Sequence, residues 1–414
     1  MNIILNRTKR FCGYLVGIVF FISGVLKLLD PVGTSMIVDE YYKFMHMDFL
    51  SFSAKPVAVA VSMAETLIGA ALITGVWRRV TALAAIVAMG IFMLISVALL
   101  VFDPVMDCGC FGEAVHLTHM QTFVKNLILS VLCCISFFPF SSLGRPKKRK
   151  YVAFSLVTAA LALFAVYSLM YIPVVDFTDY SASARLEASE RHSGSTLAAE
   201  DEYEAVFVYE KNGRTREFTL DDLPDSTWTF VSTETVKKEE NVRYGESVIS
   251  LPVIDGYGEY HDRMALGHKV MVVSVYAPER LSVRKWRTIS SYIGSAAENG
   301  FRPLVLVAAS PEKGQDILSL LEQEDGIDMD LLRDSFFYSD YKTLITLNRS
   351  NGGATYFSEG FLVRKWSFRG FPGDSRMKEL GQEDPTEPLL SYGTVGNLLF
   401  QALLLFSFAV MLLL

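Results

Sequence analysis

The stretch that decides the fold class is residues Val80–Phe102, which read VTALAAIVAMGIFMLISVALLVF. It contains no charged side chain. A hydrocarbon core about 30 Å thick needs about 20 helical residues to span it. This stretch therefore predicts a transmembrane helix.

Five further segments support the same prediction. In chain order they are Phe11–Leu29, Pro56–Trp77, Ala114–Phe138, Tyr151–Val175 and Ser391–Leu414. The last two carry no charge, whereas the first three contain Lys27, Glu65 and Lys125 respectively. The chain of 414 residues is 51% hydrophobic, with a mean hydropathy of +0.31. These values exclude a simple soluble enzyme and predict an α-helical membrane bundle in contact with the lipid bilayer.

Charge divides the chain into two different parts. Residues 1–173 hold 14 basic and 8 acidic residues, whereas residues 174–414 hold 24 and 37. The acidic stretch between the fifth and sixth apolar segments is long enough for one polar domain with linkers. Its negative charge argues against a nucleic-acid partner, because a phosphate-binding surface should be basic.

Basic residues near the ends of the apolar segments predict the topology, since Lys and Arg are retained on the cytoplasmic side. Ten of them fall before the first segment and in the loops between the second and third and between the fourth and fifth. The opposite short loops carry only Lys43 and Lys55. We therefore expect both termini to be cytoplasmic and the acidic domain to be extracytoplasmic. The first segment lacks a convincing cleavage site and is interpreted as a retained helix.

The most specific motif is the loop Asp107-Cys108-Gly109-Cys110-Phe111-Gly112-Glu113. Two thiols one residue apart can close a small, strained disulfide, and strained exposed disulfides tend to be labile. The glycines can adopt the positive φ angles of a tight loop, while the flanking carboxylates, if close, would raise a thiol pKa. Cys108 and Cys110 are thus a candidate redox pair. A structural disulfide and two inert thiols remain open alternatives. No metal site or cofactor is assigned, because two cysteines are too few for zinc unless His116 and His119 join them.

The first 140 residues resemble the DoxX-like superfamily, in the branch of the methylamine utilisation protein MauE. The resemblance is carried by residues 21–31 (FISGVLKLLDP), by Glu65, Gly69, Gly75 and Arg78, and by residues 107–112 (DCGCFG). It implies a four-helix membrane module that supports thiol, disulfide or electron-transfer chemistry of periplasmic partners.

The ionisable residues inside the apolar segments should be paired or face the bundle interior, because an unpaired charge there costs at least about 2.5 kcal/mol. Lys27 lies near the outer end of the first segment, and Glu65 is nine or ten residues into the second. Their depths differ by about 10 Å, which a lysine and a water can bridge. Three interpretations of these charges are open: a structural ion pair, a proton or ligand pathway, or a Lys27 side chain that reaches the membrane interface alone.

The acidic region has two expected parts. Strands at Ala205–Tyr209, Thr215–Phe218 and Trp228–Val231, with an Asn212-Gly213 turn, predict a small β appendage after a linker over residues 181–202. Further on, the pattern predicts strands at Val270–Val275, Pro303–Ala308, Thr343–Leu347, Ala354–Tyr356 and Phe361–Trp366, with helices at Leu281–Ala297 and Gln315–Glu322. This order resembles thioredoxin-like α/β folds.

The thioredoxin landmarks are missing from this region. The first strand is followed by YAPERLS (276–282) instead of Cys-x-x-Cys, and NGGA (351–354) stands where a proline would precede the third strand. The domain itself is therefore expected to bind or position a partner rather than to exchange thiols.

These observations predict the following domains: 1–143, a four-helix module; 144–175, a fifth span; 176–202, a linker; 203–250, a β appendage; 251–388, a thioredoxin-like domain; and 391–414, a sixth span. The expected function is an accessory one, supporting the thiol, disulfide or sulfur redox state, or the maturation, of an exported protein partner in the periplasm or membrane. The alternative is a non-catalytic scaffold in which the cysteines are structural. The sequence leaves open whether the chain is an enzyme.

Overall fold

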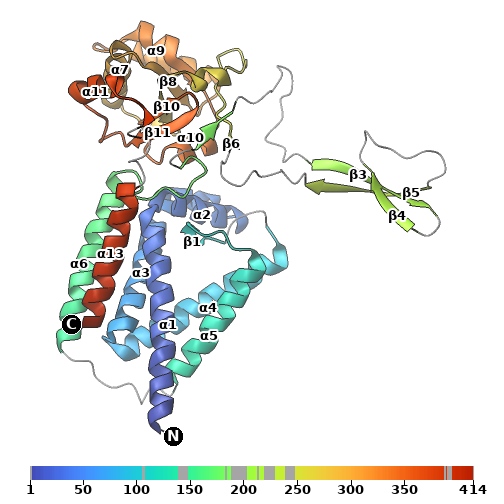
Figure 1. The fold of residues 1–414 in the computed structure, drawn as a ribbon, viewed down its shortest axis with the longest axis vertical. Helices are drawn as coiled ribbons and strands as arrows, with labels where there is room; N and C mark the ends of the chain where they lie inside the picture. Colours follow the sequence, from blue (N-terminus) through green and yellow to red (C-terminus); the bar gives the residue numbers. More distant parts are fainter. Residues whose placement is uncertain are drawn as a thin grey trace. The chain divides into compact units, whose positions relative to one another are not determined.

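The computed structural model describes residues 2–104, 108–138, 148–181, 184–187, 203–211, 214–218, 229–237, 248–386, 388 and 394–413. The chain forms two compact units, Ser189–Ser247 and the remainder, Met1–Ala188 with Val248–Leu414. The larger unit contains a helical bundle and a mixed β-sheet (Figure 1).

The six predicted spans are confirmed as helices that are long and apolar enough to cross a membrane. They are α1 (Asn2–Leu29), α3 (Ala54–Thr74), α4 (Arg78–Phe102), α5 (His119–Phe137), α6 (Lys148–Met170) and α13 (Thr394–Leu413). Several boundaries differ from expectation, and two of these differences have a local cause. Helix α5 starts only at His119, because Thr118 and Gln121 form a capping box there. Helix α6 ends at Met170, shortly before Pro173, which cannot continue a helix.

Small residues bring α1 and α3 together. A Cβ atom on Gly69 would collide with the backbone of Phe21, and one on Gly24 would collide with Thr66. Such close approach is how membrane helices gain packing contacts without a hydrophobic driving force. Helix α1 also packs on α4 and α5 through a core that includes Phe20 and Met89. On another side, α6 and α13 run side by side (Figure 1) and join α1 and α3 in a second core.

A helix that is not one of the six spans follows α1 directly. The Asp30 side chain accepts a hydrogen bond from the Gly33 N–H at 2.9 Å, and Pro31 occupies the first turn, so α2 (Pro31–Phe44) begins there. A 3₁₀ helix, η1 (Asp48–Ser53), then leads into α3. This turn places α2 against α3 and next to β1 (Cys110–Glu113).

The larger unit also contains a seven-stranded sheet in the order β6-β2-β11-β10-β7-β8-β9. Its strands are β2 (Arg185–Leu186), β6 (Val248–Ile249), β7 (Val270–Val275), β8 (Arg302–Val307), β9 (Phe336–Tyr338), β10 (Gly353–Ser358) and β11 (Phe361–Trp366). Strands β7, β8 and β9 are parallel, whereas β10 runs antiparallel to both β7 and β11. Residues of β7 alternate between the cores on the two faces, as a strand covered on both sides requires.

Helices cover both faces of this sheet. On one face lie α7 (Val283–Glu298), α8 (Pro311–Leu321), α9 (Met329–Ser335) and α11 (Asp374–Gln382). The other face is covered by α10 (Tyr341–Leu347) and by the segment around Leu251 and Val253. The mixed α/β class is therefore as predicted from the alternating pattern.

The predicted strand at Thr343–Leu347 is wrong, because these residues belong to helix α10. The Asp340 side chain accepts a hydrogen bond from the Thr343 N–H at 2.7 Å and caps the helix, while Leu344 and Leu347 pack into the core. The neighbour of β8 is instead β9, which was not predicted. A short apolar run does not distinguish a strand from one buried turn of helix.

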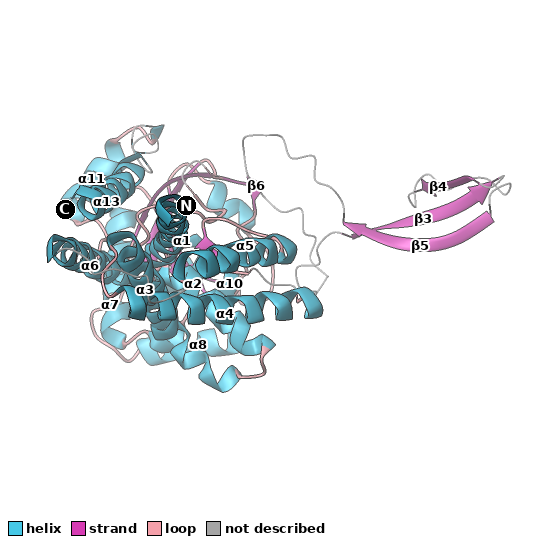
Figure 2. Cartoon of the chain, turned by 90° about the horizontal axis from the view of Figure 1, so that it is seen from below, coloured by secondary structure: helices cyan, strands magenta, loops and turns pink. Residues whose placement is uncertain are grey.

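The smaller unit contains an antiparallel sheet in which β3 (Tyr203–Lys211) lies between β4 (Arg214–Phe218) and β5 (Thr229–Lys237), as Figure 2 shows. The first two predicted strands are confirmed. The third, expected at Trp228–Val231, corresponds to β5, and Trp228 and the Asn212-Gly213 turn lie outside the described residues. Part of the expected linker, Arg185 and Leu186, forms strand β2 of the larger sheet.

Candidate functional site

The two loop cysteines lie between α2 and α5. Gly109 and Gly112 both adopt φ +61°, the left-handed conformation that glycine favours. The Tyr41 hydroxyl on α2 donates a hydrogen bond to the Cys108 carbonyl at 2.9 Å. Both thiols are free, and Asp107 lies outside the described residues. The loop is therefore held by backbone geometry and by α2, without a disulfide.

The two thiols have different acidities. A hydrogen bond from Cys110 lowers the pKa of Cys108 to about 5, and a hydrogen bond from Thr122 and the charge of Lys125 act in the same direction. The Thr122 hydroxyl lies 2.9 Å from the Cys108 sulfur. The same thiol contact, with burial, raises the pKa of Cys110. The pair therefore consists of one readily ionised sulfur and one that keeps its proton.

This result differs from the expectation that flanking carboxylates raise the thiol pKa. The Glu113 carboxylate forms an ion pair with Arg349 of the sheet region. Glu113 Oε1 lies 3.3 Å from Arg349 Nη2. Its negative charge is therefore partly neutralised. Sequence spacing shows that a carboxylate is near a thiol but does not show which cation it faces.

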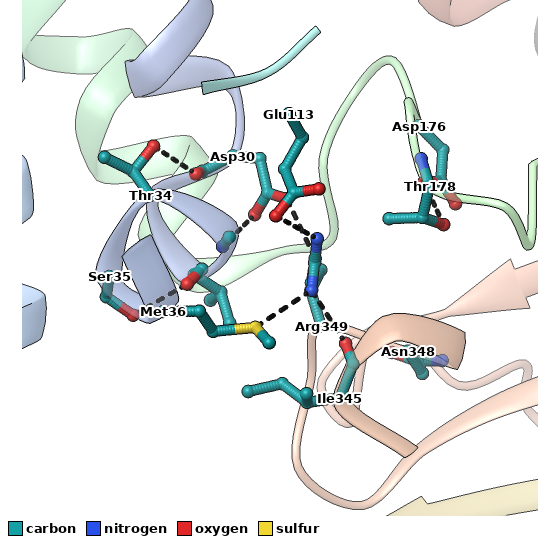
Figure 3. A network of polar contacts seen from close by, with 12 residues as sticks. Asp30, Thr34, Ser35, Met36, Glu113, Asp176, Thr178, Ile345, Asn348 and Arg349 are labelled. Atoms are coloured by element: carbon teal, nitrogen blue, oxygen red, sulfur yellow. Dashed lines mark hydrogen bonds and ion pairs between the residues drawn. The ribbon is translucent and has the colours of Figure 1, made fainter. Parts of the chain in front are cut away.

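Arg349 connects the sheet to the bundle (Figure 3). It lies in the loop between α10 and β10, and its Nε donates to Asp30 Oδ2 at 2.8 Å. Its Nη1 donates to the Ile345 carbonyl at 3.2 Å. Burial alone would lower the pKa of the guanidinium, but the charges of Asp30 and Glu113 outweigh it and the pKa is raised. The arginine is thus a buried cation between the cap of α2 and the end of the cysteine loop.

Sequence reasoning did not identify Arg349 as a site residue. Asp30 was noticed only as part of the FISGVLKLLDP stretch. A contact between residues 319 positions apart leaves no local pattern. The only available signal was the single arginine in the unusual loop Asn348–Gly352, where the expected proline is missing.

A second ion pair lies deeper in the bundle. Lys27 Nζ is 2.5 Å from Glu65 Oε2, and both side chains are buried. The Ser23 hydroxyl lies 2.8 Å from Glu65 Oε1 and 2.6 Å from the Cys110 carbonyl oxygen. A hydroxyl has one proton, so Ser23 donates to one of these two acceptors at a time. The expected Lys27–Glu65 contact is therefore present and is linked to the cysteine loop.

The third ionisable residue, Lys125, lies on α5 beside the same loop. Its Nζ stands 4.9 Å from the centre of the Phe111 ring, at cation–π distance. Its charge and a hydrogen bond from it favour ionisation of Cys110, without outweighing the effects that raise that pKa. The structure thus brings all three predicted intramembrane residues to the neighbourhood of the two thiols.

These groups line one cavity of about 360 Å³. Its walls come from α1, α2, α3, α4, α5 and the cysteine loop. The polar lining includes Lys27, Glu65, Lys125, Asn126, Cys108 and Cys110. Most of the remaining lining is apolar, including Ile37, Phe44, Val61, Phe92 and Ile95. The cavity is therefore an apolar chamber with two thiols and three charged groups at its wall.

No metal cluster accompanies these groups. Among the described residues, no three or more His, Cys, Asp or Glu side chains converge closely enough to hold a metal ion. His119 faces Asp103 instead of the cysteines, with Nδ1 2.9 Å from Oδ1.

Comparison with known families adds to this geometry. Residues 5–139 match the family model described as Methylamine utilisation protein MauE. This part of the chain is MauE-like. The match spans α1 to α5 and includes the cysteine loop and the Lys27–Glu65 pair. Together with the six apolar helices, it identifies a multi-pass membrane protein.

Residues 203–240 match a family described as a domain of unknown function, DUF8463, which covers the three strands of the smaller unit. No curated protein and no solved structure significantly matches the chain.

Proposed function

We propose that the protein is an accessory protein of the bacterial cytoplasmic membrane in which Cys108 and Cys110 cycle between dithiol and disulfide. Through this cycle it supports the thiol redox state, or the maturation, of an exported partner protein. The match of residues 5–139 to a methylamine utilisation protein supports an accessory membrane role.

The observation that carries the proposal is a pair of free thiols on one tight loop at the cavity wall, with the Thr122 hydroxyl 2.9 Å from the Cys108 sulfur. A thiolate is the attacking species in thiol–disulfide exchange, and Cys108 is ionised at neutral pH because its pKa is lowered to about 5. Cys110 retains a proton and lies next to it. A Cys-Gly-Cys disulfide closes a small ring, which favours a labile, oxidising bond over a structural one.

The sheet region fits a positioning role. The order β11-β10-β7-β8, with β7 and β8 parallel and β10 antiparallel, supports a thioredoxin-like relationship. The edge that carries Cys-x-x-Cys in a thioredoxin has Ala277 here, whose carbonyl accepts a hydrogen bond from Asn351 at 2.7 Å. The same edge carries Arg349, which holds Asp30 and Glu113. We therefore assign this region to holding the cysteine loop and presenting a partner to it from the periplasm.

Thiol trapping tests the proposal in growing cells. The wild-type pair should be found partly reduced and partly oxidised, and Cys110→Ser should accumulate a mixed disulfide on Cys108. The matched control is Cys134→Ser, which changes an exposed cysteine of α5 that does not line the cavity. Complete oxidation that resists reductants, without a trapped species, would instead favour the scaffold function in which the cysteines only hold the loop.

A further inference from the structure

We infer that the cavity beside Cys108 and Cys110 binds a lipophilic quinone, which accepts the two electrons of the dithiol. The inference rests on the proposed function and names the electron acceptor at the same site. Three properties of the cavity support it: its access from the surface of the bundle, the chemistry of its wall, and its size.

Access to the cavity is from an apolar surface. Three lining residues are also exposed: Met45, which caps the end of α2, at 49%, Val61 of α3 at 44% and Ile95 of α4 at 37%. Val61 and Ile95 belong to helices of the membrane-spanning set. The face of α4 next to Ile95 carries further exposed apolar side chains, such as Leu94 at 73%. A ligand that enters here comes from the hydrocarbon of the bilayer, which selects a lipid-soluble carrier over a water-soluble thiol.

The cavity wall offers hydrogen-bond donors and aromatic side chains, which suit a flat ring with two opposed oxygen acceptors. A lysine ammonium has three N–H donors, and Glu65 accepts from Lys27, which leaves Lys27 further donors for a carbonyl oxygen. Lys125 and the Asn126 amide are additional donors at the cavity wall. Phe92, Phe44 and Tyr41 supply aromatic surface on which a ring can stack. A hydrocarbon tail alone would leave these donors unused.

The size also suits a small ring with part of its tail. Ligand cavities in proteins are about 300–1,000 Å³, and this one is about 360 Å³. Because both cysteines line it, a bound ring lies next to the reacting residues.

The reaction balances with a quinone alone as oxidant. An S–S bond forms between Cys108 and Cys110, and their two electrons pass to the ring, whose two C=O groups become C–OH groups. One proton comes from the Cys110 thiol. The other comes from the Lys125 ammonium, which then takes up the proton that Cys108 released on ionising. The products are one disulfide and one hydroquinone.

The test uses the purified full-length protein in lipid nanodiscs, reduced, freed of reductant and kept without oxygen. Decylubiquinone is added, its reduction is followed by ultraviolet absorbance, and the thiols are counted by mass spectrometry. We expect one quinone reduced for each two thiols lost at Cys108 and Cys110. A parallel sample receives the water-soluble oxidant diamide, which reports whether the pair can form a disulfide at all.

Variants on one helix separate the cavity from the lipid surface. Ile95→Trp fills the cavity and should slow quinone reduction by at least about tenfold. Leu94→Trp, on the neighbouring exposed position outside the cavity, should leave the rate unchanged. If Ile95→Trp does not fold, Val61→Trp on α3 tests the same access to the cavity, because Val61 is also an exposed lining residue. In the unmodified protein, a photoreactive azidoquinone should label peptides of α2 to α5 that line the cavity.

The outcomes distinguish the two proposals. A disulfide formed by diamide but not by decylubiquinone would overturn the quinone assignment and leave the redox cycle standing. Equal rates in the Ile95 and Leu94 variants, or azidoquinone labelling elsewhere, would also overturn it. No disulfide with either oxidant would reject the redox cycle itself. Reduction in the expected ratio, slowed only by the cavity variants, supports both.

Discussion

Cys110 donates a hydrogen bond to the sulfur of Cys108, and this contact is the largest influence that lowers the pKa of Cys108. A hydroxyl at position 110 can donate in the same way, whereas a methyl group cannot. Two substitutions at one position therefore separate the hydrogen bond from the presence of a second thiol.

We expect Cys110→Ala to raise the pKa of Cys108 towards the ordinary value of about 8.5, while Cys110→Ser keeps it low. The lowered pKa means that Cys108 is a thiolate above about pH 5. Alkylation of Cys108 at pH 6 should therefore be at least about tenfold slower in the alanine than in the serine variant. Mass spectrometry of the Cys108 peptide between pH 4 and pH 9 gives the titration curve. Identical curves for the two variants would show that the Cys110 thiol does not set the acidity.

A second prediction concerns the contribution of the buried Lys27–Glu65 ion pair to stability. Removing one partner of a buried pair leaves an uncompensated charge and costs about 3–5 kcal/mol. Glu65→Gln and Lys27→Met should each lower the thermal midpoint and the yield of folded protein, and the double variant should recover part of both.

The control for this pair is Lys43→Met, because Lys43 is 62% exposed in its contact with Asp39. An exposed pair contributes about 0–1 kcal/mol, so this variant should behave like the wild type. Additive losses in the Lys27 and Glu65 double variant would show that the two charges are not coupled.

At the scale of elements, the cysteine loop depends on a residue from the sheet. Arg349 reaches Glu113 at the end of β1 and Asp30 at the start of α2. Arg349→Leu should therefore speed amide hydrogen exchange over residues 108–113 and speed labelling of Cys108. The matched control is Arg333→Leu, which removes an exposed pair with Glu322 and should change neither. Unchanged exchange in the Arg349 variant would show that β1 is held without this contact.

The elements also show what sequence patterns can and cannot predict. Hydropathy predicted all six spans, because lipid requires every backbone group to be satisfied within a helix. For Lys27 and Glu65 the sequence left an ion pair, a proton or ligand pathway and an unpaired lysine open, and the structure shows a direct ion pair without a bridging water. The prediction of a strand at Thr343–Leu347 is wrong because Asp340 caps a helix there and because β9, not this segment, pairs with β8. Arg349 could not be assigned, since its partners lie in distant parts of the chain.

The candidate site shows the same limit. The sequence identified Cys108, Cys110, Gly109 and Gly112 as a tight loop, and both glycines adopt positive φ. It did not reveal the cavity, which needs side chains from five helices to be placed together. The lowered pKa of Cys108 likewise depends on Thr122, fourteen positions away on α5.

At the scale of the whole molecule, the distribution of basic residues predicts that both termini are cytoplasmic. Six spans are an even number, so the two ends of the chain belong on one side. Within the bundle, Lys150 at the start of α6 donates to the Met411 carbonyl at the end of α13, at 2.8 Å. The basic first turn of α6 and the end of the last helix are therefore neighbours, which agrees with a common side.

The orientation predicts which parts of the chain a protease reaches. In spheroplasts, added protease should cut between about residues 185 and 200, because the positive-inside rule places the acidic region outside. Epitope tags at both termini should remain intact, and in inside-out vesicles the pattern should reverse, with the tags lost and residues 185–200 protected. Lysed spheroplasts, in which both regions are cut, show that each is sensitive to the enzyme. Loss of the tags in intact spheroplasts would invert the topology, and would place the cysteine loop on the reducing side of the membrane, where a stable disulfide is disfavoured.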